Sequence, residues 1–226
     1  MTNHSYEIEI KSLLGNKDAA EALKQKMKAA DSAFIEHGSH KQLNHYFIGG
    51  NLKDLAAKLD SHLPDDKKTL LADIASKARD FSVRTRWADG TVLVVVKASV
   101  DDTTSSNGTA RLEWESPVTI TMEELDALVL SAGFTYQAKW SREREDFSYK
   151  GANVSIDKNA GYGYLAEFEM IADNPEAADQ TKQQLRDMMA ELGVEELPQD
   201  RLARMFDYYN ANWAEYYGTD KIFNIE

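Results

Sequence analysis

The chain contains no cysteine. Disulfide bonds, thiolate metal sites and cysteine nucleophiles are therefore all excluded. Long apolar runs are also missing, since no stretch approaches the ~18 residues that a membrane-spanning helix requires. The first residues, Met1 to Ser5, lack the apolar segment of a secretory signal. These absences predict a cytoplasmic protein with no membrane partner.

Basic residues are in the minority, with 26 Lys and Arg against 38 Asp and Glu, so the formal net charge is −12. Such a charge repels nucleic acid, and no basic run with interleaved aromatic residues is present. A small polyanion held by a local basic cluster remains compatible with the sequence, because distant charges are screened. The length allows one large core. The oligomeric state stays open between a monomer and a homodimer.

Charged residues alternate with apolar residues in several segments that are typical of strands. In Glu7-Ile8-Glu9-Ile10-Lys11 the three charged side chains share one face of a strand, and the isoleucines share the other. The same alternation recurs at Arg84 and Arg86, at Arg111, Glu113 and Glu115, at Arg142 and Arg144, and at Glu167 and Glu169. In an open sheet these rows would face water, whereas a closed barrel would bring acids and bases together in its lumen.

This arrangement resembles the CYTH family of triphosphate tunnel metalloenzymes, which includes class IV adenylate cyclases, thiamine triphosphatases and inorganic triphosphatases. The resemblance runs from residue 5 to residue 170 and rests on the charged rows above together with Lys97 and Asp157. Two positions depart from the family pattern. Asn44 stands where an acid is common, and Ile48 stands where an aspartate is expected.

The resemblance implies an α+β fold, a closed antiparallel β-barrel of about eight strands, with helices packed outside it and a C-terminal helical segment. We expect the barrel to span residues 1–172 with a helical insertion at 51–78. Residues 173–226 are expected to form helices that pack on the barrel within the same domain. The last helix, 199–217, carries an apolar stripe of Leu202, Met205, Phe206, Tyr209, Trp213 and Tyr216.

Two local patterns carry further predictions. Thr121 and Glu124 form a capping box that predicts the start of a helix. Residues 32–47 read as two strands that turn at Gly38. Three histidines in or near this segment, His37, His40 and His45, lack a fixed ligand spacing, so we read them as strand and loop residues rather than as a metal site.

The carboxylates of the rows have no histidine or cysteine beside them, and such oxygen donors suit Mg²⁺ or Mn²⁺ better than Zn²⁺. The first choice of metal ligands is Glu7, Glu9, Glu167 and Glu169, and the second is Glu113, Glu115 and Asp157. A cation at this position would also relieve the repulsion among the acids.

The basic residues of the rows suit phosphate, because arginine offers a planar fork and lysine a point charge. The predicted phosphate-binding residues are Lys11, Arg84, Arg86, Lys97, Arg111, Arg142 and Arg144. Five residues are expected to act in catalysis, namely Glu7, Glu9, Lys11, Arg84 and Arg86. By the resemblance, the chain is then a divalent-metal-dependent hydrolase of inorganic tripolyphosphate or of an organic triphosphate.

Three alternatives remain open at this point. The first is an adenylate cyclase that makes cyclic AMP and pyrophosphate from ATP; Trp140 is the one aromatic residue that the alternation places on the charged face. The second is a polyphosphate or nucleotide binder without catalysis. The third is a barrel in which the charged rows form only interlocking salt bridges, an arrangement that barely offsets the desolvation of its ions.

Overall fold

A computed structural model describes residues 6–99, 104–105, 108–109, 112–172 and 177–226. Within these residues the chain is α+β, with an eight-stranded antiparallel sheet in the order β1-β10-β9-β8-β2-β3-β4-β7 and a separate hairpin of β5 and β6. The described order begins at β1 and ends at β7, so a closed barrel is not confirmed. The strands are β1 Tyr6–Gly15, β2 Ile35–Gly49, β3 Asp80–Ala88, β4 Thr91–Ser99, β5 Thr104–Ser105, β6 Gly108–Thr109, β7 Leu112–Val118, β8 Phe134–Tyr149, β9 Ala152–Asn159 and β10 Gly163–Ala172.

The chain divides into two compact units, which are described separately. Unit 1 comprises residues 1–41 and 141–226, and unit 2 comprises residues 42–140. Both β2 and β8 continue from one unit into the other. The described helices are α1 Lys17–Ala30, α2 Leu52–Leu59, α3 Asp65–Lys77, α4 Met122–Ser131, α5 Ala178–Leu192 and α6 Gln199–Tyr216, with a 3₁₀ turn, η1, at Asp60–His62. None of the described helices is both long and apolar enough to cross a membrane.

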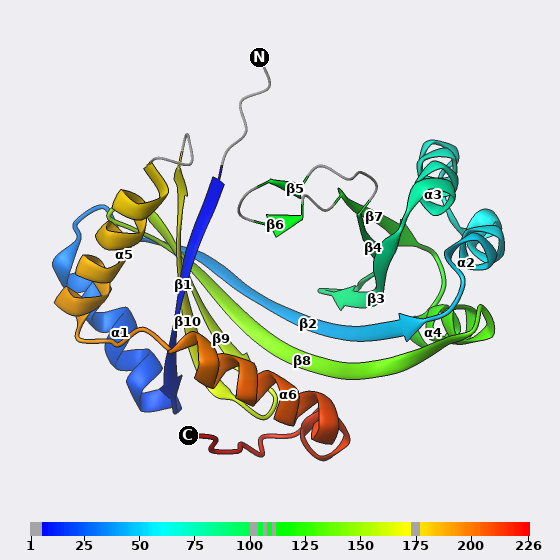
Figure 1. Cartoon of the computed structure of the whole chain (residues 1–226). Coiled ribbons are helices and arrows are strands. Elements are labelled where there is room, and N and C mark those ends of the chain that lie inside the picture. Colours follow the sequence, from blue (N-terminus) through cyan, green and yellow to red (C-terminus); the bar gives the residue numbers. More distant parts are fainter. Residues whose placement is uncertain (1–5, 100–103, 106–107, 110–111, 173–176) are drawn as a thin grey trace. The chain divides into compact units, whose positions relative to one another are not determined.

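In unit 1, α1 and α5 cover one face of the strands β1 and β10 (Figure 1). The core between them is made of alternate strand residues such as Ile10 and Phe168, against Leu23 of α1 and Leu185 of α5. Burying this apolar face against two helices leaves the opposite face of the same strands for polar side chains.

The third helix of unit 1, α6, packs on the turn between β9 and β10. Tyr209 is fully buried, and its ring lies 5.8 Å from that of Tyr162 in this turn. The chain after α6 returns to the same turn, where the Phe223 N–H donates to the Gly161 carbonyl at 2.8 Å. Of the apolar stripe that the sequence shows on this helix, Met205, Tyr209 and Tyr216 are buried. Phe206 is 43% exposed, and it lies about 100° around the helix from Met205.

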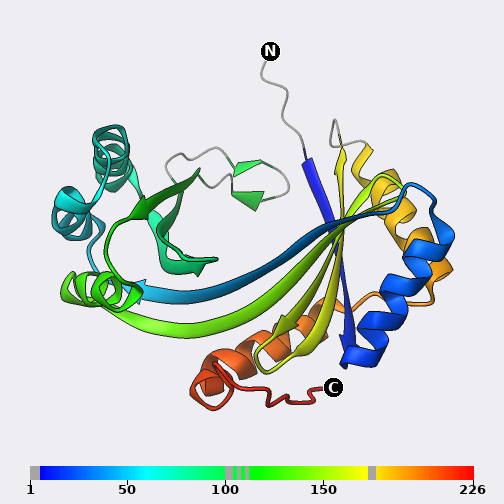
Figure 2. The ribbon, with the colours of Figure 1, turned by 180° about the vertical axis from the view of Figure 1, so that it is seen from behind.

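Unit 2 holds the other three helices together on one side of its strands (Figure 2). The expected capping box starts α4, since Thr121 accepts from the Glu124 N–H and the Glu124 side chain accepts from the Thr121 N–H. Leu125 and Val129 of α4, Leu71 of α3 and the completely buried Trp114 of β7 belong to one apolar core.

The prediction of two strands turning at Gly38 is wrong. Residues 35–49 form the single strand β2, and Gly38 lies inside it with φ of +123°. Glycine tolerates this conformation without reversing the chain. Residues Gln42–Phe47 pair with β3 instead of folding back on residues 32–37, so tertiary pairing outweighs the local glycine signal.

Candidate functional site

The strands of unit 1 have a charged face opposite α1 and α5. Ile10 of β1 lies opposite Phe168 of β10, and both side chains are buried in the core on the helix side. Because neighbouring residues of a strand point to opposite faces, Glu9 and Lys11 lie on the side away from these helices. The hydrophobic alternation of β1 thus sets the position of the charged residues.

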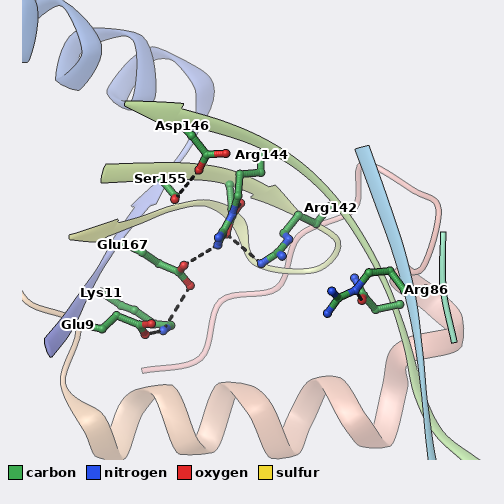
Figure 3. Close-up of polar contacts among 10 residues, drawn as sticks. Glu9, Lys11, Arg86, Arg142, Arg144, Asp146, Ser155 and Glu167 are labelled. Carbon is green, nitrogen blue, oxygen red and sulfur yellow. Dashed lines mark hydrogen bonds and ion pairs between the residues drawn. The ribbon is translucent and has the colours of Figure 1, made fainter. Parts of the chain in front are cut away.

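The pairing register places the predicted site residues opposite one another. Lys11 is the cross-strand partner of Glu167, and Glu9 is that of Glu169. Arg144 of β8 is likewise the partner of Asp157 of β9. Side chains at such paired positions share one face of the sheet and lie within contact distance. Figure 3 shows Glu9 and Lys11 of β1, Glu167 of β10, and Arg144 and Arg142 of β8 in one row.

Arg144 is the centre of this row. Its Nε donates to Asp157 Oδ1 at 2.7 Å and its Nη2 to Asp157 Oδ2 at 2.6 Å, and Nη2 also donates to Glu167 Oε2 (Figure 3). Burial lowers the pKa of Arg144, but Asp157 and Glu167 raise it above its ordinary value, so the guanidinium remains charged. The two carboxylates therefore fix the orientation of this cation.

Lys11 extends the row to β1. Its Nζ lies 3.3 Å from Glu167 Oε1 and also forms an ion pair with Glu9. Burial raises the pKa of Glu167, but the charges of Arg144, Lys11 and Arg142 outweigh this and hold it below its ordinary value. Glu167 is therefore ionised at neutral pH and links the cations of β8 and β1.

Arg142 lies beside Arg144 on the same strand, with its Nη1 3.5 Å from Asp157 Oδ2 and its side chain 25% exposed. Further along β8, Asp146 accepts a hydrogen bond of 2.7 Å from the Ser155 hydroxyl and lies 3.4 Å from His40 Nε2. The charged face therefore continues beyond the residues that the sequence singled out. Ser155 carries no sequence signal of its own and is found only through its register with Glu167.

Unit 2 has its own cluster of charged residues on β3. Arg86 Nε donates to Asn44 Oδ1 at 2.8 Å, and Arg86 Nη1 donates to Glu115 Oε2 at 3.1 Å. The guanidinium of Arg84 stacks 4.5 Å above the ring of Tyr46, its cross-strand partner. Arg84 Nε is buried and has no hydrogen-bond partner among the described residues. A buried donor without a partner is costly, so this atom is available to a bound acceptor.

Two further cations of unit 2 lie next to β7. Lys97 of β4 is the cross-strand partner of Glu113 in β7. Lys67 of α3 donates to the Glu115 carbonyl oxygen at 2.9 Å. The sequence did not point to Lys67, because its helix is separated from β7 by more than thirty residues and only the tertiary structure brings them together.

The structure does not describe every predicted residue. Arg111 lies outside the described residues, and for Glu7 and Glu113 only the backbone is described. Among the described residues, no three or more Asp, Glu, His or Cys side chains are arranged so that they could hold a metal ion. Of the predicted metal ligands, Glu9 and Glu169 lie at paired positions on β1 and β10. Two others form ion pairs with cations, Asp157 with Arg144 and Glu167 with Lys11.

Comparison with known proteins shows the family of this chain and proteins of similar fold. The model of the CYTH domain matches residues 65–201, more than half of the chain, so this protein belongs to the CYTH domain family. The PH1012 protein from Pyrococcus horikoshii has a similar structure, with a TM-score of 0.52, 19% identity, and coverage of 84% of this chain and 92% of that one. A proposed adenylate cyclase from Vibrio parahaemolyticus gives a TM-score of 0.54 at 12% identity, over 89% and 98% of the two chains. Identities this low show a shared fold alone. The search of curated proteins returned no match.

Proposed function

We propose that this protein is a divalent-metal-dependent hydrolase of small-molecule triphosphates. The observation that carries the proposal is Arg144, held in one orientation by Asp157 and Glu167 on a face of the sheet that is not covered by α1 or α5. An arginine fixed in this way presents its charge without having to order its side chain on binding. Membership of the CYTH domain family supports the same reading.

The proposed role of Arg142 and Lys11 is to bind phosphate oxygens beside Arg144. Arg142 and Lys11 have side chains 25% and 26% exposed, so both are accessible from solvent while partly desolvated. Charge-assisted hydrogen bonds to phosphate are stronger in such surroundings than in open water. An anion bound here would compete with Glu9 and Glu167 for Lys11.

In unit 2, the buried Nε of Arg84 is the strongest sign of a missing acceptor. Arg86 is oriented by Asn44 and Glu115, as Arg144 is by its carboxylates. The closed barrel expected from the sequence belongs to this proposal. In each unit, the proposed role of these oriented arginines is to bind phosphate oxygens.

The chemistry of the donors fits a hard divalent cation. Glu9 and Glu169 occupy directly opposed positions on β1 and β10, where two like charges repel unless a cation lies between them. We propose that these two residues hold Mg²⁺ or Mn²⁺, with Glu7, two residues before Glu9, as a further ligand. When bound, such an ion neutralises phosphate oxygens and lowers the pKa of a coordinated water.

The residues of the chain would contribute mainly by positioning. Phosphoryl transfer needs the transferred group held in line with the attacking and leaving oxygens, while negative charge on its other oxygens is neutralised. Arg144 and Arg142 would stabilise that charge, and Glu167 would keep Arg144 from turning away. Water would attack the terminal phosphorus as its P–O bond to the bridging oxygen breaks, so that the attacked group leaves as orthophosphate and the remaining diphosphate takes the bridging oxygen. The proton that the water loses would pass to a product phosphate oxygen or to solvent.

The experiment that tests the proposal compares two arginine variants of unit 1. Arg142→Ala should lower the kcat/KM of phosphate release from tripolyphosphate with Mn²⁺ by the equivalent of about 1.5 to 3 kcal/mol. Arg186→Ala is the matched control, because this arginine of α5 is paired with Glu196 on the surface and lies outside the charged row. Equal rates for the two variants would contradict the proposal.

The adenylate cyclase alternative is tested with the same protein. The fold is shared with a proposed adenylate cyclase, and cyclisation of ATP would require contacts to adenine and ribose in addition to the phosphate row. If cyclic AMP is the main product from ATP, the protein is an adenylate cyclase and the proposal of a hydrolase is wrong. Tight binding of tripolyphosphate without turnover would identify a non-catalytic binder.

A further inference from the structure

A buried carboxylate joins β2 to β3 on the face opposite Arg84 and Arg86. Asp126 of α4 is 5% exposed, and its two oxygens accept hydrogen bonds from both strands. We infer that Asp126 is a positioning residue, which holds the β2–β3 pair in the arrangement that orients the two arginines for phosphate. This inference rests on the proposed function, since it assigns Asp126 a role in the same site.

The geometry of the contact is specific to a cross-strand pair. His45 Nδ1 lies 2.7 Å from Asp126 Oδ2, and the Thr85 hydroxyl donates to Asp126 Oδ1 at 2.6 Å. His45 and Thr85 are direct partners in the β2–β3 ladder. One carboxylate thus clamps both members of a single pair, one oxygen to each strand.

The clamped pair lies between the two pairs that carry the arginines. In the same ladder, Asn44 is the partner of Arg86 and Tyr46 is the partner of Arg84. These are the residues that contact the two guanidinium groups, through the Asn44 amide and the Tyr46 ring. Because side chains alternate along a strand, a shift or twist at the clamped pair moves both neighbouring contacts on the other face.

The surroundings of Asp126 indicate that it is not there for stability alone. The core on this side of the strands is apolar and includes Phe47, Val83, Leu125 and Val129. Replacing a buried charged network by apolar residues of similar volume is often neutral or stabilising. A buried network in which every polar group is hydrogen-bonded instead holds the elements that it joins in a single arrangement.

The groups that face Asp126 come from α4's packing partners β2, β3 and β8. Besides His45 and Thr85, the Tyr136 hydroxyl donates to Asp126 Oδ2 at 2.7 Å, and Lys139 Nζ lies 3.9 Å from the same atom. Burial raises the pKa of Asp126, but the hydrogen bonds from His45, Thr85 and Tyr136 outweigh it and hold the pKa below its ordinary value. The carboxylate is therefore ionised and accepts all of these contacts at neutral pH.

The test measures the affinity for tripolyphosphate in EDTA, so that binding is read without turnover. Asp126→Asn and Thr85→Val should weaken binding roughly tenfold, because each loosens the clamp and lets the arginines leave their position. Thr85→Ser keeps the hydroxyl and should bind as the wild type does. Thr121→Ala is the control for stability, because it removes the N-cap of the same helix without touching the clamp.

A double-mutant cycle separates positioning from general destabilisation. In an Arg86→Ala background, Asp126→Asn should cost distinctly less affinity than in the wild type, since part of what it positions is already gone. The inference is overturned if the two substitutions are fully additive in this cycle, or if Thr85→Val binds tripolyphosphate as tightly as the wild type does. It is also overturned if Thr121→Ala, at a matched melting temperature, loses as much affinity as Asp126→Asn. If the wild type binds tripolyphosphate only with Mn²⁺, the same comparisons are made with Mn²⁺. Failure of the wild type to bind tripolyphosphate both in EDTA and with Mn²⁺ overturns the proposed function, and the inference with it.

Discussion

Arg144 and Asp157 face each other across β8 and β9 and are joined by two hydrogen bonds, of 2.7 and 2.6 Å. The side chain of Asp157 is 2% exposed, so its charge depends on this one arginine for most of its compensation. The pair therefore has two roles in our account. It stabilises the sheet of unit 1, and it fixes the cation on which the proposed phosphate site is centred.

Arg144→Ala should lower the free energy of unfolding by roughly 3 kcal/mol, because the buried Asp157 carboxylate then keeps only the longer contact with Arg142. Adding Asp157→Asn should restore part of this loss by removing the unpaired charge. Urea denaturation measures both effects, with Arg186→Ala as a surface control expected to change stability by less than about 1 kcal/mol. An unchanged unfolding midpoint for Arg144→Ala would show that the pair does not stabilise the fold.

Glu167 should make stability sensitive to acid. Although burial raises its pKa, Arg144, Lys11 and Arg142 hold the folded value below the ordinary 4.5. A depressed folded pKa means that the contribution of Glu167 is fully present above about pH 4.5 and is lost as the pH falls through the lower folded value. The difference in unfolding free energy between the wild type and Glu167→Gln should therefore stay constant near neutrality and shrink below pH 4.5. A difference that grows on acidification would mean that the folded pKa is raised.

Glu169→Gln should raise the Mn²⁺ concentration needed for half-maximal phosphate release by roughly tenfold or more, because one anionic oxygen ligand is lost. The fold should be retained, since the substitution also removes the like charge opposite Glu9. Glu143→Gln is a matched control on β8, where the side chain is 54% exposed and paired with Lys41. The metal assignment is wrong if Glu169→Gln, like the control, needs the same Mn²⁺ concentration as the wild type.

Arg84→Ala tests the arginine cluster of unit 2. The variant should lose about 1.5 to 3 kcal/mol of transition-state stabilisation, and Arg84→Lys should recover only part of that loss because the planar fork is missing. The kcat/KM of phosphate release from tripolyphosphate measures both effects. Equal kcat/KM values for Arg84→Lys and the wild type would show that the fork of Arg84 is not used.

The sequence was sufficient for features that depend on neighbouring residues. The capping box of α4 and the alternation in β1 both rest on local chemistry, and the structure confirms them. Gly38 was misread because a positive φ can occur within a strand as well as in a turn.

Contacts between distant parts of the chain could not be read in the same way. Lys67, Ser155 and Asp126 meet their partners only through the strand register and the helix packing, and no short motif marks them. The alternation of apolar residues correctly predicted that Lys11 and Glu167 lie on the charged face. It could not predict that they face each other, because that depends on the register between β1 and β10. Glu7, Glu113 and Arg111 remain predictions from the sequence.

The most direct test of the central claim is to incubate the protein with tripolyphosphate and, separately, with ATP under the same Mg²⁺ or Mn²⁺ concentration and to identify all products. Our account predicts orthophosphate from tripolyphosphate, no turnover in excess chelator, and a higher kcat/KM for tripolyphosphate than for any cyclisation of ATP. Cyclic AMP formed from ATP faster than tripolyphosphate is cleaved would contradict it, as would full activity in excess chelator.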